Sequence, residues 1–267
     1  MAWDADGEAL TGQVMTKAKR KRSKPSSATP AVLMARGLRR EYDDLIALAP
    51  LDLQVAPGEL VALVGANGAG KTTLMAMVAG LLEPSQGTIQ ICGAPAGSLA
   101  ARARTSYIPD TPIFYQDLSL GEHLEYVARL HGAPDWQRRA SELLEQLGLE
   151  QWGDKLPTQF SRGMRQKASI ALGFIRPFSL LVADEPFDGL DPSSRGVLVE
   201  MLRSASASGA AVIVSTHRTE VADISSRCIA LHDGQLVYDG PPDRAVIAGH
   251  LPPSADALLA AEVTEPG

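Results

Sequence analysis

The feature of the sequence that most constrains the fold is GANGAGKTT, residues 65–73, which directly follows the apolar run ELVALV. The stretch fits the pattern G-x-x-x-x-G-K-[ST], with Gly65, Gly70, Lys71 and Thr72 at the defined positions. Glycines remove the Cβ atoms that would hold a backbone away from phosphate, and the start of a helix adds a favourable partial positive charge. A glycine-rich turn would explain either glycine alone, but not the lysine, the threonine and the apolar run together. The sequence therefore predicts a strand, a phosphate-binding loop and a helix.

The residues expected around the phosphates all belong to this loop. Lys71 can reach the β and γ phosphates of a nucleotide, and the Thr72 hydroxyl can join the shell of a Mg²⁺ ion. The full set of predicted phosphate-binding residues is Gly65, Ala66, Asn67, Gly68, Ala69, Gly70, Lys71, Thr72 and Thr73.

Two carboxylates stand at the end of another apolar run, SLLVADEP, residues 179–186. Adjacent strand residues face opposite ways, so Asp184 is expected to face a metal ion and Glu185 the water that attacks phosphorus. The Asn-Lys-x-Asp motif by which a GTPase would read its base is absent from the sequence. The pattern predicts nucleotide chemistry in which Asp184 holds the metal and Glu185 acts on water.

The composition favours one globular domain with subdomains, because 267 residues with 45% hydrophobic content and a mean hydropathy of −0.01 can bury a core. The apolar runs are strand-sized, whereas a membrane span needs about 20 apolar residues, so we expect no span. The acidic first residues lack the apolar segment of a secretory signal, so we expect the protein to stay in the cytoplasm. Cys92 and Cys228 lie in apolar stretches without metal-site spacing and are expected to be reduced core thiols.

The two ends of the chain differ from its body. KAKRKRSK at residues 17–24 makes the first thirty residues basic, in a chain whose net charge is −6. Residues 1–31 are therefore predicted to be a flexible basic tail, and a solvated arm is favoured over one that binds anionic lipid or nucleic acid. We expect no specific nucleic-acid partner. Residues 246–267 are predicted to be a polar C-terminal tail.

Between the tails, a sheet-rich half is followed by a helical insert. Short apolar runs from residue 32 to about residue 93 are separated by turn residues, as in a sheet. From about residue 117 the apolar period becomes helical. Ser119 and Glu122 form a possible capping box, and Asp135 is expected to cap the helix WQRRASELLEQLG.

Strands and helices then alternate. SLLVAD and AAVIVST are expected as buried strands, with helices from about residue 192 to 206 and from about residue 220, and CIALHDGQLVYDG is expected as a closing hairpin. This order is typical of a parallel sheet with helical crossovers. The predicted domain covers residues 32–245, with a helical subdomain at about 110–177.

FSRGMRQKASIAL, residues 160–172, completes a set of ordered motifs. Together these motifs resemble the ATP-binding subunit of the ABC transporter family over most of residues 32–240. GANGAGKTT resembles its phosphate loop, FSRGM its L-S-G-G-Q signature, LLVADEP its second phosphate-site strand, GLD its interface loop and STH its switch histidine. The resemblance implies an α/β fold of the P-loop NTPase, ABC ATPase type, with a parallel-sheet core, an antiparallel β subdomain and an inserted α-helical subdomain.

The resemblance also implies partners. In the family two such domains pair head to tail, and each ATP lies between the phosphate loop of one and the signature of the other. Ser161, as the N-cap of the signature helix, and Gly163 would then bind a phosphate held by a second ATP-binding subunit, either a homodimer partner or a paralogue. An ordinary capped helix would account for Ser161 but not for Gly163. MRQK resembles exporters whose membrane domain is a separate transmembrane permease, which implies a place at the cytoplasmic face of the cell membrane.

Two further residues take their roles from the resemblance. His217 follows the strand AAVIVST, where it would contact the γ-phosphate and share the catalytic role with Glu185. Tyr42, in REYDD, matches the aromatic residue that stacks on adenine. Taken singly, a histidine at a strand end is commonly structural, and an exposed turn tyrosine is unremarkable.

The sequence departs from the family pattern at several positions. Asp110, in SYIPDTP, stands where the family has glutamine, and its carboxylate could coordinate Mg²⁺ or cap the turn beside a proline. Arg162 replaces the first glycine of the signature, and Met164 replaces its glutamine. The arginine could contact phosphate or face solvent, and the sequence leaves both open.

These residues predict a Mg²⁺-dependent ATPase subunit that powers a membrane transporter, most simply an exporter, through ATP-driven pairing of two nucleotide domains. ATP and Mg²⁺ are the expected cofactors, with Thr72, Asp184 and Asp110 around the metal. One alternative is a nucleotide-gated module that dimerises with little hydrolysis, which the intact Glu185 and His217 argue against. Another is a soluble ABC ATPase outside transport, whose fused second domain or long coiled coil is absent from the sequence.

Overall fold

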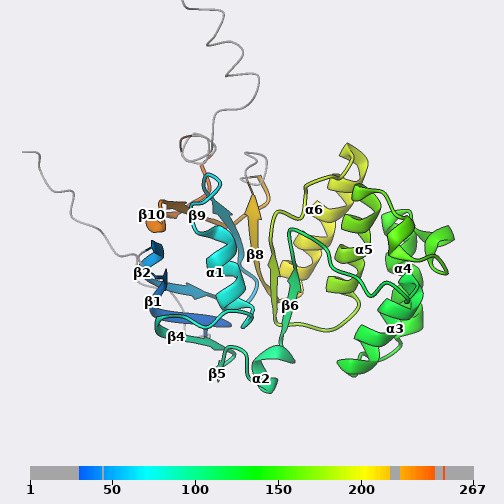
Figure 1. The fold of residues 1–267 in the computed structure, drawn as a ribbon, viewed down its shortest axis with the longest axis horizontal. Helices are drawn as coiled ribbons and strands as arrows, with labels where there is room; N and C mark the ends of the chain where they lie inside the picture. The colour runs from blue at the N-terminus through cyan, green and yellow to red at the C-terminus, as the bar shows by residue number, and fades with distance from the viewer. Residues whose placement is uncertain (1–29, 44, 217–222, 244–248, 250–267) are drawn as a thin grey trace, which may run out of the picture.

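The computed structural model describes residues 30–43, 45–216, 223–243 and 249 (Figure 1). The strands are β1 (Leu33–Tyr42), β2 (Leu45–Val55), β3 (Leu60–Val64), β4 (Gln86–Ile91), β5 (Ala94–Pro95), β6 (Thr105–Ile108), β7 (Leu180–Ala183), β8 (Ala211–Thr216), β9 (Arg227–His232) and β10 (Gln235–Gly240). The helices are α1 (Lys71–Val78), α2 (Leu99–Arg102), α3 (Leu120–Leu130), α4 (Trp136–Leu147), α5 (Arg162–Phe174) and α6 (Pro192–Ala207), with 3-10 turns at Glu150–Trp152 and Pro157–Gln159.

The strands form two sheets. An antiparallel sheet has the order β2-β1-β4-β5, and a larger sheet has the order β10-β9-β3-β8-β7-β6. In the larger sheet all neighbours from β9 to β6 are parallel, and β10 pairs with β9 in an antiparallel hairpin. The expected α/β fold, with a parallel core and a separate antiparallel sheet, is therefore confirmed.

The central parallel strands are buried on both faces. In β3, Leu60, Ala62 and Val64 belong to a core shared with α3 to α6, whereas Val61 and Leu63 belong to a second core shared with α1 and the antiparallel sheet. The residues of β7 and β8 divide between the two cores in the same alternating way. Because side chains alternate along a strand, a strand covered on both faces is apolar throughout. This explains the continuous apolar runs of the sequence.

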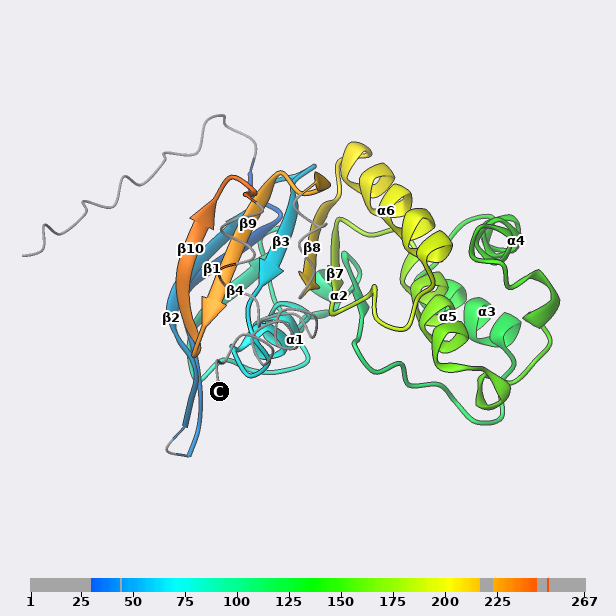
Figure 2. The ribbon, with the colours of Figure 1, turned by 90° about the horizontal axis from the view of Figure 1, so that it is seen from above.

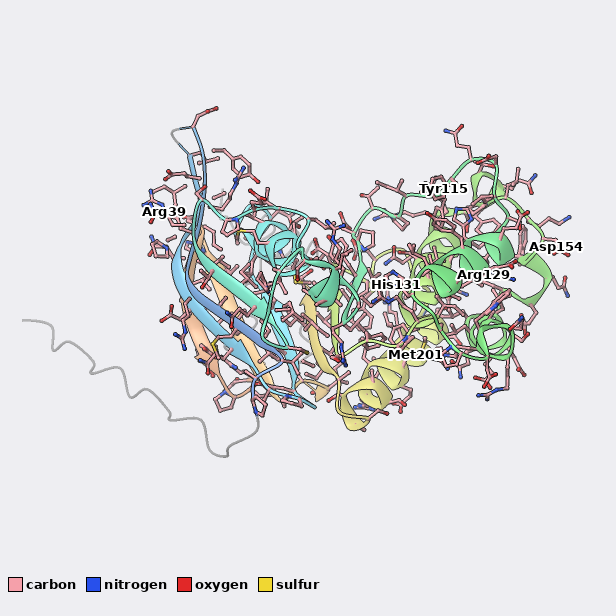
Figure 3. All side chains as sticks on the ribbon, turned by 90° about the horizontal axis from the view of Figure 1, so that it is seen from below. Arg39, Tyr115, Arg129, His131, Asp154 and Met201 are labelled. Carbon is pink, nitrogen blue, oxygen red and sulfur yellow. The ribbon has the colours of Figure 1, made fainter. Side chains whose placement is uncertain are left out.

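Helices α3, α4 and α5 lie at the end of the molecule opposite the antiparallel sheet (Figure 2). Figure 3 shows the same separation, with Arg39 at the sheet end and Asp154 at the helical end. The predicted capping box of α3 is confirmed, because Ser119 Oγ accepts the Glu122 N–H at 3.3 Å and the Glu122 carboxylate accepts the Ser119 N–H at 2.7 Å. The expected cap of α4 is wrong. Asp135 has a left-handed backbone with φ of 47° and makes no side-chain cap bond, so its carboxylate does not reach the helix N–H groups.

The two cysteines lie in different surroundings. Cys228 is buried in β9, and burial raises the pKa of its thiol to about 11. Cys92 is exposed in the turn after β4, with φ of 49°, so the expectation of a second core thiol is wrong.

The helix expected from about residue 220 would begin within residues 217–222, which lie outside the described residues. Within the described ranges, no helix has the length and apolar character needed to cross a membrane.

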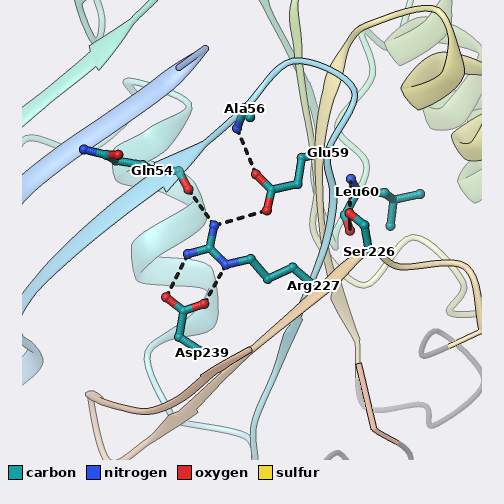
Figure 4. A network of polar contacts seen from close by, with 7 residues as sticks. All are labelled: Gln54, Ala56, Glu59, Leu60, Ser226, Arg227 and Asp239. Atoms are coloured by element: carbon teal, nitrogen blue, oxygen red, sulfur yellow. Dashed lines mark hydrogen bonds and ion pairs between the residues drawn. The ribbon is translucent and has the colours of Figure 1, made fainter. Parts of the chain in front are cut away.

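One arginine, Arg227, links the two sheets by hydrogen bonds near the amino end of β3 (Figure 4). Arg227 in β9 donates to both carboxylate oxygens of Asp239 in β10, at 2.5 and 2.7 Å. Its remaining guanidinium nitrogen donates to the Gln54 carbonyl of β2 at 2.8 Å and to Glu59 at 3.2 Å. The hydrogen bonds that Arg227 donates to Asp239 raise the pKa of the Arg227 guanidinium. The network therefore joins β2, the start of β3, β9 and β10.

Replacing Arg227 by methionine should lower the free energy of unfolding by about 1–3 kcal/mol, because the partly buried carboxylates of Glu59 and Asp239 lose their cation. Urea unfolding followed by circular dichroism measures the change. Arg203→Met is the matched control, since Arg203 pairs with Glu200 on the exposed surface of α6, and it should cost less than about 0.5 kcal/mol. Equal losses in the two variants would show that the network does not hold the sheets together.

Candidate functional site

The phosphate loop predicted from the sequence connects β3 to α1 and is held by close backbone packing. A Cβ atom at Gly65 would lie 2.4 Å from the Leu231 carbonyl oxygen, and one at Gly70 would lie 2.7 Å from the Ala47 carbonyl oxygen. Gly70 also has φ of 97° directly before the helix. Both positions therefore require glycine. The first N–H groups of α1 have no partners within the helix, so the loop leads to a backbone site suited to an anion.

Lys71 is the first residue of α1, and its ammonium group lies against the loop. Its Nζ donates to the carbonyl oxygens of Gly65 at 2.8 Å and Ala66 at 3.3 Å. The same Nζ lies 3.5 Å from Oε1 of Glu185, and the two side chains are only 7% and 15% exposed. An ammonium group with so little water around it depends on these oxygens, and phosphate oxygens would serve it equally.

A hydroxyl on β8 bridges the two carboxylates that follow β7. Ser215 Oγ donates to Asp184 Oδ1 at 2.5 Å and accepts the Glu185 backbone N–H at 2.8 Å. Sequence reasoning missed Ser215. The available signal was a serine directly after the apolar run AAVIV; in the structure, its strand lies next to the strand that leads to the carboxylates.

The sequence argument that placed the two carboxylates on opposite faces of a strand is wrong. β7 ends at Ala183, and Glu185 has a left-handed backbone with φ of 44°. Glu185 reaches Lys71 because the chain turns after the strand. The alternation of strand residues therefore does not decide which way either carboxylate points.

One oxygen of Asp184 suits a metal ion. The side chain is fully buried, and its Oδ2 has no hydrogen-bond partner among the described residues. A buried carboxylate oxygen without a partner is costly, and a divalent cation with a preference for oxygen ligands would satisfy it. In the part of the chain that the structure describes, no group of three His, Cys, Asp or Glu side chains could hold a metal by itself. A cation here would need nucleotide oxygens as further ligands.

Most of the predicted phosphate and metal residues share one pocket of about 550 Å³. Its lining combines the loop with two other segments and the tips of two hairpins. The residues are Ala66, Asn67, Gly68, Gly70, Lys71, Thr72 and Thr73 of the loop and α1, Asp110, Glu185, and the hairpin residues Leu45, Ile46, Ala47, Asp233 and Gly234. Gly65, Ala69 and Asp184 are not in this lining. Gly65 packs against Leu231, and Ala69 and Asp184 are buried.

Sequence reasoning did not single out the hairpin residues. Leu45 and Ile46 are exposed apolar side chains at the start of β2, and apolar side chains of this kind can cover the face of a nucleobase. Two consecutive apolar residues directly after the turn residues Asp43 and Asp44 were the signal in the sequence.

Asp110 lies in the pocket beside other carboxylates. Burial raises the pKa of the Asp110 carboxyl, the charges of Asp184 and Asp188 raise it further, and Arg162 and Lys71 act in the opposite direction. A nearby cation would therefore favour the charged form of Asp110. Among the described residues no hydrogen bond joins the Asp110 carboxylate to the turn that follows it, so the turn-capping alternative has no contact to support it here.

Tyr42, which is predicted to stack on adenine, is not in the pocket lining. Tyr42 ends β1, and the Arg40 guanidinium lies over its ring, 4.2 Å from the ring centroid. Its cross-strand partner Leu45 lines the pocket instead. Stacking of adenine on Tyr42 stays a prediction, and it would use the ring face that Arg40 does not cover. His217 lies outside the described residues, so its contact with phosphate also stays a prediction.

The signature segment lies outside this pocket. Ser161 is the N-cap of α5 as expected, and its Oγ accepts the Met164 N–H at 3.2 Å. A Cβ atom at Gly163 would lie 2.7 Å from the Gly189 carbonyl oxygen. The argument that an ordinary capped helix leaves Gly163 unexplained is therefore wrong, because close packing on Gly189 already requires glycine there.

Arg162, the replacement within the signature, contacts the loop that follows the carboxylates. Its Nη2 lies 3.7 Å from Oδ2 of Asp188, while the side chain remains 80% exposed. The arginine therefore largely faces solvent, which is one of the two options that the sequence left open, and it also pairs with Asp188 of its own chain.

Comparisons with known proteins agree with this geometry. A family model described as ABC transporter matches residues 48–188, which include the loop and both carboxylates. The chain is 34% identical over 221 residues to a Nod factor export ATP-binding protein I of Cupriavidus metallidurans, covering 81% of this chain and 73% of that protein.

Solved structures share the fold. One described as the ATP-binding subunit of an ABC transporter is 33% identical, with a TM-score of 0.76, and covers 88% of this chain and 100% of its own. A dimeric bacterial ABC transporter cassette has a TM-score of 0.73 at 24% identity, covering 79% and 99% of the two chains, which shows the fold alone. On the sequence match, which spans more than half of the chain, the protein belongs to the ABC transporter family as an ATP-binding subunit.

Proposed function

We propose that this chain is a Mg²⁺-dependent ATPase that powers a membrane exporter, paired with a second ATP-binding subunit on a separate transmembrane permease. The observation that carries the proposal is the meeting of the phosphate loop, the buried ammonium group of Lys71 and the carboxylate of Glu185 in one pocket, with the ammonium and carboxylate 3.5 Å apart. A phosphate group bound beside Lys71 would have a proton acceptor next to it.

Lys71 and Glu185 would divide the chemistry between them. The ammonium group of Lys71 would bind the β and γ phosphates, and the phosphates would replace Glu185 as its counter-charge. Released from this ion pair, the Glu185 carboxylate would accept a proton from the water whose oxygen bonds to the γ phosphorus. The bond from phosphorus to the bridging oxygen breaks, and ADP leaves with the electron pair.

Three residues would hold Mg²⁺. The Thr72 hydroxyl and Asp110 line the pocket, and Asp184 offers the buried Oδ2 that lacks a hydrogen-bond partner among the described residues. When bound, the ion neutralises phosphate charge and orients the phosphate chain. The other ligands would be oxygens of ATP and water, as Mg²⁺ usually takes few protein ligands.

The position of the signature residues supports the proposal of a second subunit. Ser161 and Gly163 are not in its lining, so as phosphate-binding residues they would act on ATP held by a second copy or a paralogue. His217 would contact the γ-phosphate, and Tyr42 would stack on adenine. The name of the Nod factor export relative supports the exporter assignment. A separate permease would then hold the chain at the cytoplasmic face of the cell membrane.

Phosphate release from the purified protein, with and without Mg²⁺ and across a range of protein concentrations, tests the proposal. Pairing predicts a rate per subunit that rises with protein concentration, and the chemistry predicts a requirement for Mg²⁺. ATP-driven dimerisation without phosphate release would favour the nucleotide-gated module instead.

Glu185→Gln should retain ATP binding while lowering turnover by about 100-fold or more, because the amide no longer accepts a proton from water. Phosphate release measures turnover, and calorimetry measures ATP affinity. Glu200→Gln, on the exposed face of α6, is the control and should leave both unchanged. Parental turnover in Glu185→Gln would remove this residue from the mechanism.

Lys71→Ala should weaken ATP binding itself by about tenfold or more, because it removes a buried ammonium group that no other described residue replaces at the loop. Isothermal calorimetry with ATP gives the affinity directly. The control is Lys155→Ala, which removes a lysine from the exposed surface beyond α4. Unchanged affinity in Lys71→Ala would count against the phosphate-loop assignment.

Asp110→Gln should raise the Mg²⁺ concentration that gives half-maximal ATPase activity by about fivefold, because one negative charge leaves a partly screened cation site. Titration of Mg²⁺ against rate measures the shift. Asp154→Gln, at the far helical end of the molecule (Figure 3), is the control for a lost surface carboxylate. If the Asp110 and parental titrations superimpose, Asp110 is a turn residue without a part in metal binding.

A further inference from the structure

We propose that Ser215 is a positioning residue for ATP hydrolysis, through one hydroxyl that orients both the Asp184 carboxylate and the Glu185 backbone. The inference rests on the proposed function, in which Asp184 binds the cation and Glu185 accepts the proton. Ser215 would not touch substrate. It would act through the two residues that do.

The Ser215 hydroxyl donates one hydrogen bond and accepts another, each with a different neighbouring residue. Ser215 is the penultimate residue of β8 and is fully buried. A hydroxyl has one proton to give, and Ser215 gives it to Asp184 Oδ1 while its oxygen accepts the Glu185 N–H. The two partners, Asp184 and Glu185, are consecutive residues directly after the neighbouring strand β7. A rotation of the hydroxyl would therefore break at least one of the two hydrogen bonds.

The first bond determines which oxygen of Asp184 is available. Oδ1 is occupied by Ser215, and Oδ2 has no partner among the described residues. A carboxylate held at one oxygen keeps the other in a fixed direction. Residues that fix a metal ligand in this way commonly affect metal affinity or activity by about 10–100-fold.

The second bond holds the backbone of the proton acceptor. Glu185 has φ of 44°, in a region that residues other than glycine seldom occupy. Its N–H is tied to Ser215 Oγ, and with the backbone held there the Glu185 side chain reaches Lys71. Loss of the hydroxyl would leave this N–H without its acceptor and would favour a more relaxed backbone, which moves the carboxylate.

The chain offers a matched serine that lacks this connection. Ser106 in β6 is also buried, and its Oγ donates to the Gly173 carbonyl oxygen of α5 at 2.6 Å. Ser106→Ala therefore removes a buried hydroxyl and one strong hydrogen bond without touching Asp184 or Glu185. Comparison with this variant separates the loss of stability that follows removal of any buried serine hydroxyl from an effect on hydrolysis or cation binding.

The test compares Ser215→Ala, Ser215→Thr and Ser106→Ala in two measurements. The first is steady-state phosphate release, which gives kcat and the KM for ATP. The second needs no turnover: thermal unfolding with a non-hydrolysable ATP analogue is followed while Mg²⁺ is titrated, and the midpoint reports cation binding. Ser215→Cys keeps the size of the side chain with only a weak donor, and it serves if Ser215→Ala does not fold.

Ser215→Ala is expected to lower kcat by about tenfold and to raise the Mg²⁺ midpoint by about tenfold, with the KM for ATP within about threefold of the parent. Ser215→Cys should show losses in the same direction, and Ser215→Thr, which keeps the hydroxyl, should recover both values to within about threefold. Ser106→Ala should change the unfolding temperature alone. The proposal is overturned if Ser215→Ala, or Ser215→Cys in its place, has the same kcat and Mg²⁺ midpoint as Ser106→Ala.

Failure of this inference is distinguishable from failure of the proposed function. If Glu185→Gln abolishes turnover while Ser215→Ala keeps the parental kcat and midpoint, Glu185 stands and Ser215 does not. If Glu185→Gln itself keeps parental turnover, the assignment of the proton acceptor is wrong, and Ser215 loses the role of positioning it.

Discussion

Burial of both faces of the parallel sheet is the constraint on which the rest of the structure depends. With helices on one face and α1 and the antiparallel sheet on the other, polar side chains on the central strands find water only near the strand ends. Parallel pairing puts the carboxyl ends of β3, β7 and β8 at one edge. The phosphate loop, Asp184 and Ser215 all lie at that edge, which is where open α/β sheets bind ligands.

The same burial sets the electrostatics of the edge. Asp184, Glu185 and Asp110 bring three carboxylates close together, and Lys71 pairs with one of them. Burial, followed by the charges of Asp184 and Asp188, raises the pKa of Asp110, and burial together with Asp184 and Asp110 raises the pKa of Tyr107 to about 12. Such a site disfavours a further anion arriving alone. It is suited to phosphates that arrive with a divalent cation, because the cation offsets the charge of both phosphate and carboxylates.

The signature helix contacts the loop at residues 188–191, which follows the carboxylates. Arg162 pairs with Asp188, and Lys167 pairs with Asp191 at 3.6 Å. Asp191 in turn caps α6, and the hydrogen bonds from Ser194 lower its pKa to about 2. The two ion pairs therefore place α5 beside the loop that follows Glu185. The arginine that departs from the family signature fits this contact, since a glycine there would leave Asp188 without that ion pair.

The sequence by itself determined the strand, loop and helix around Lys71 and Thr72, the buried strands β7 and β8, and the paired carboxylates that follow β7, because these depend on local spacing and on continuous apolar runs. It also located the capping box of α3, a contact between residues three apart. Only the tertiary structure decided that Glu185 turns toward Lys71, that Leu45 and Ile46 line the pocket, that Gly163 is required by Gly189, and that Ser215 joins the two carboxylate residues. Each of these depends on the distance between segments far apart in the chain. That distance is set by strand register and by packing of the two cores, and no local pattern of residues encodes it.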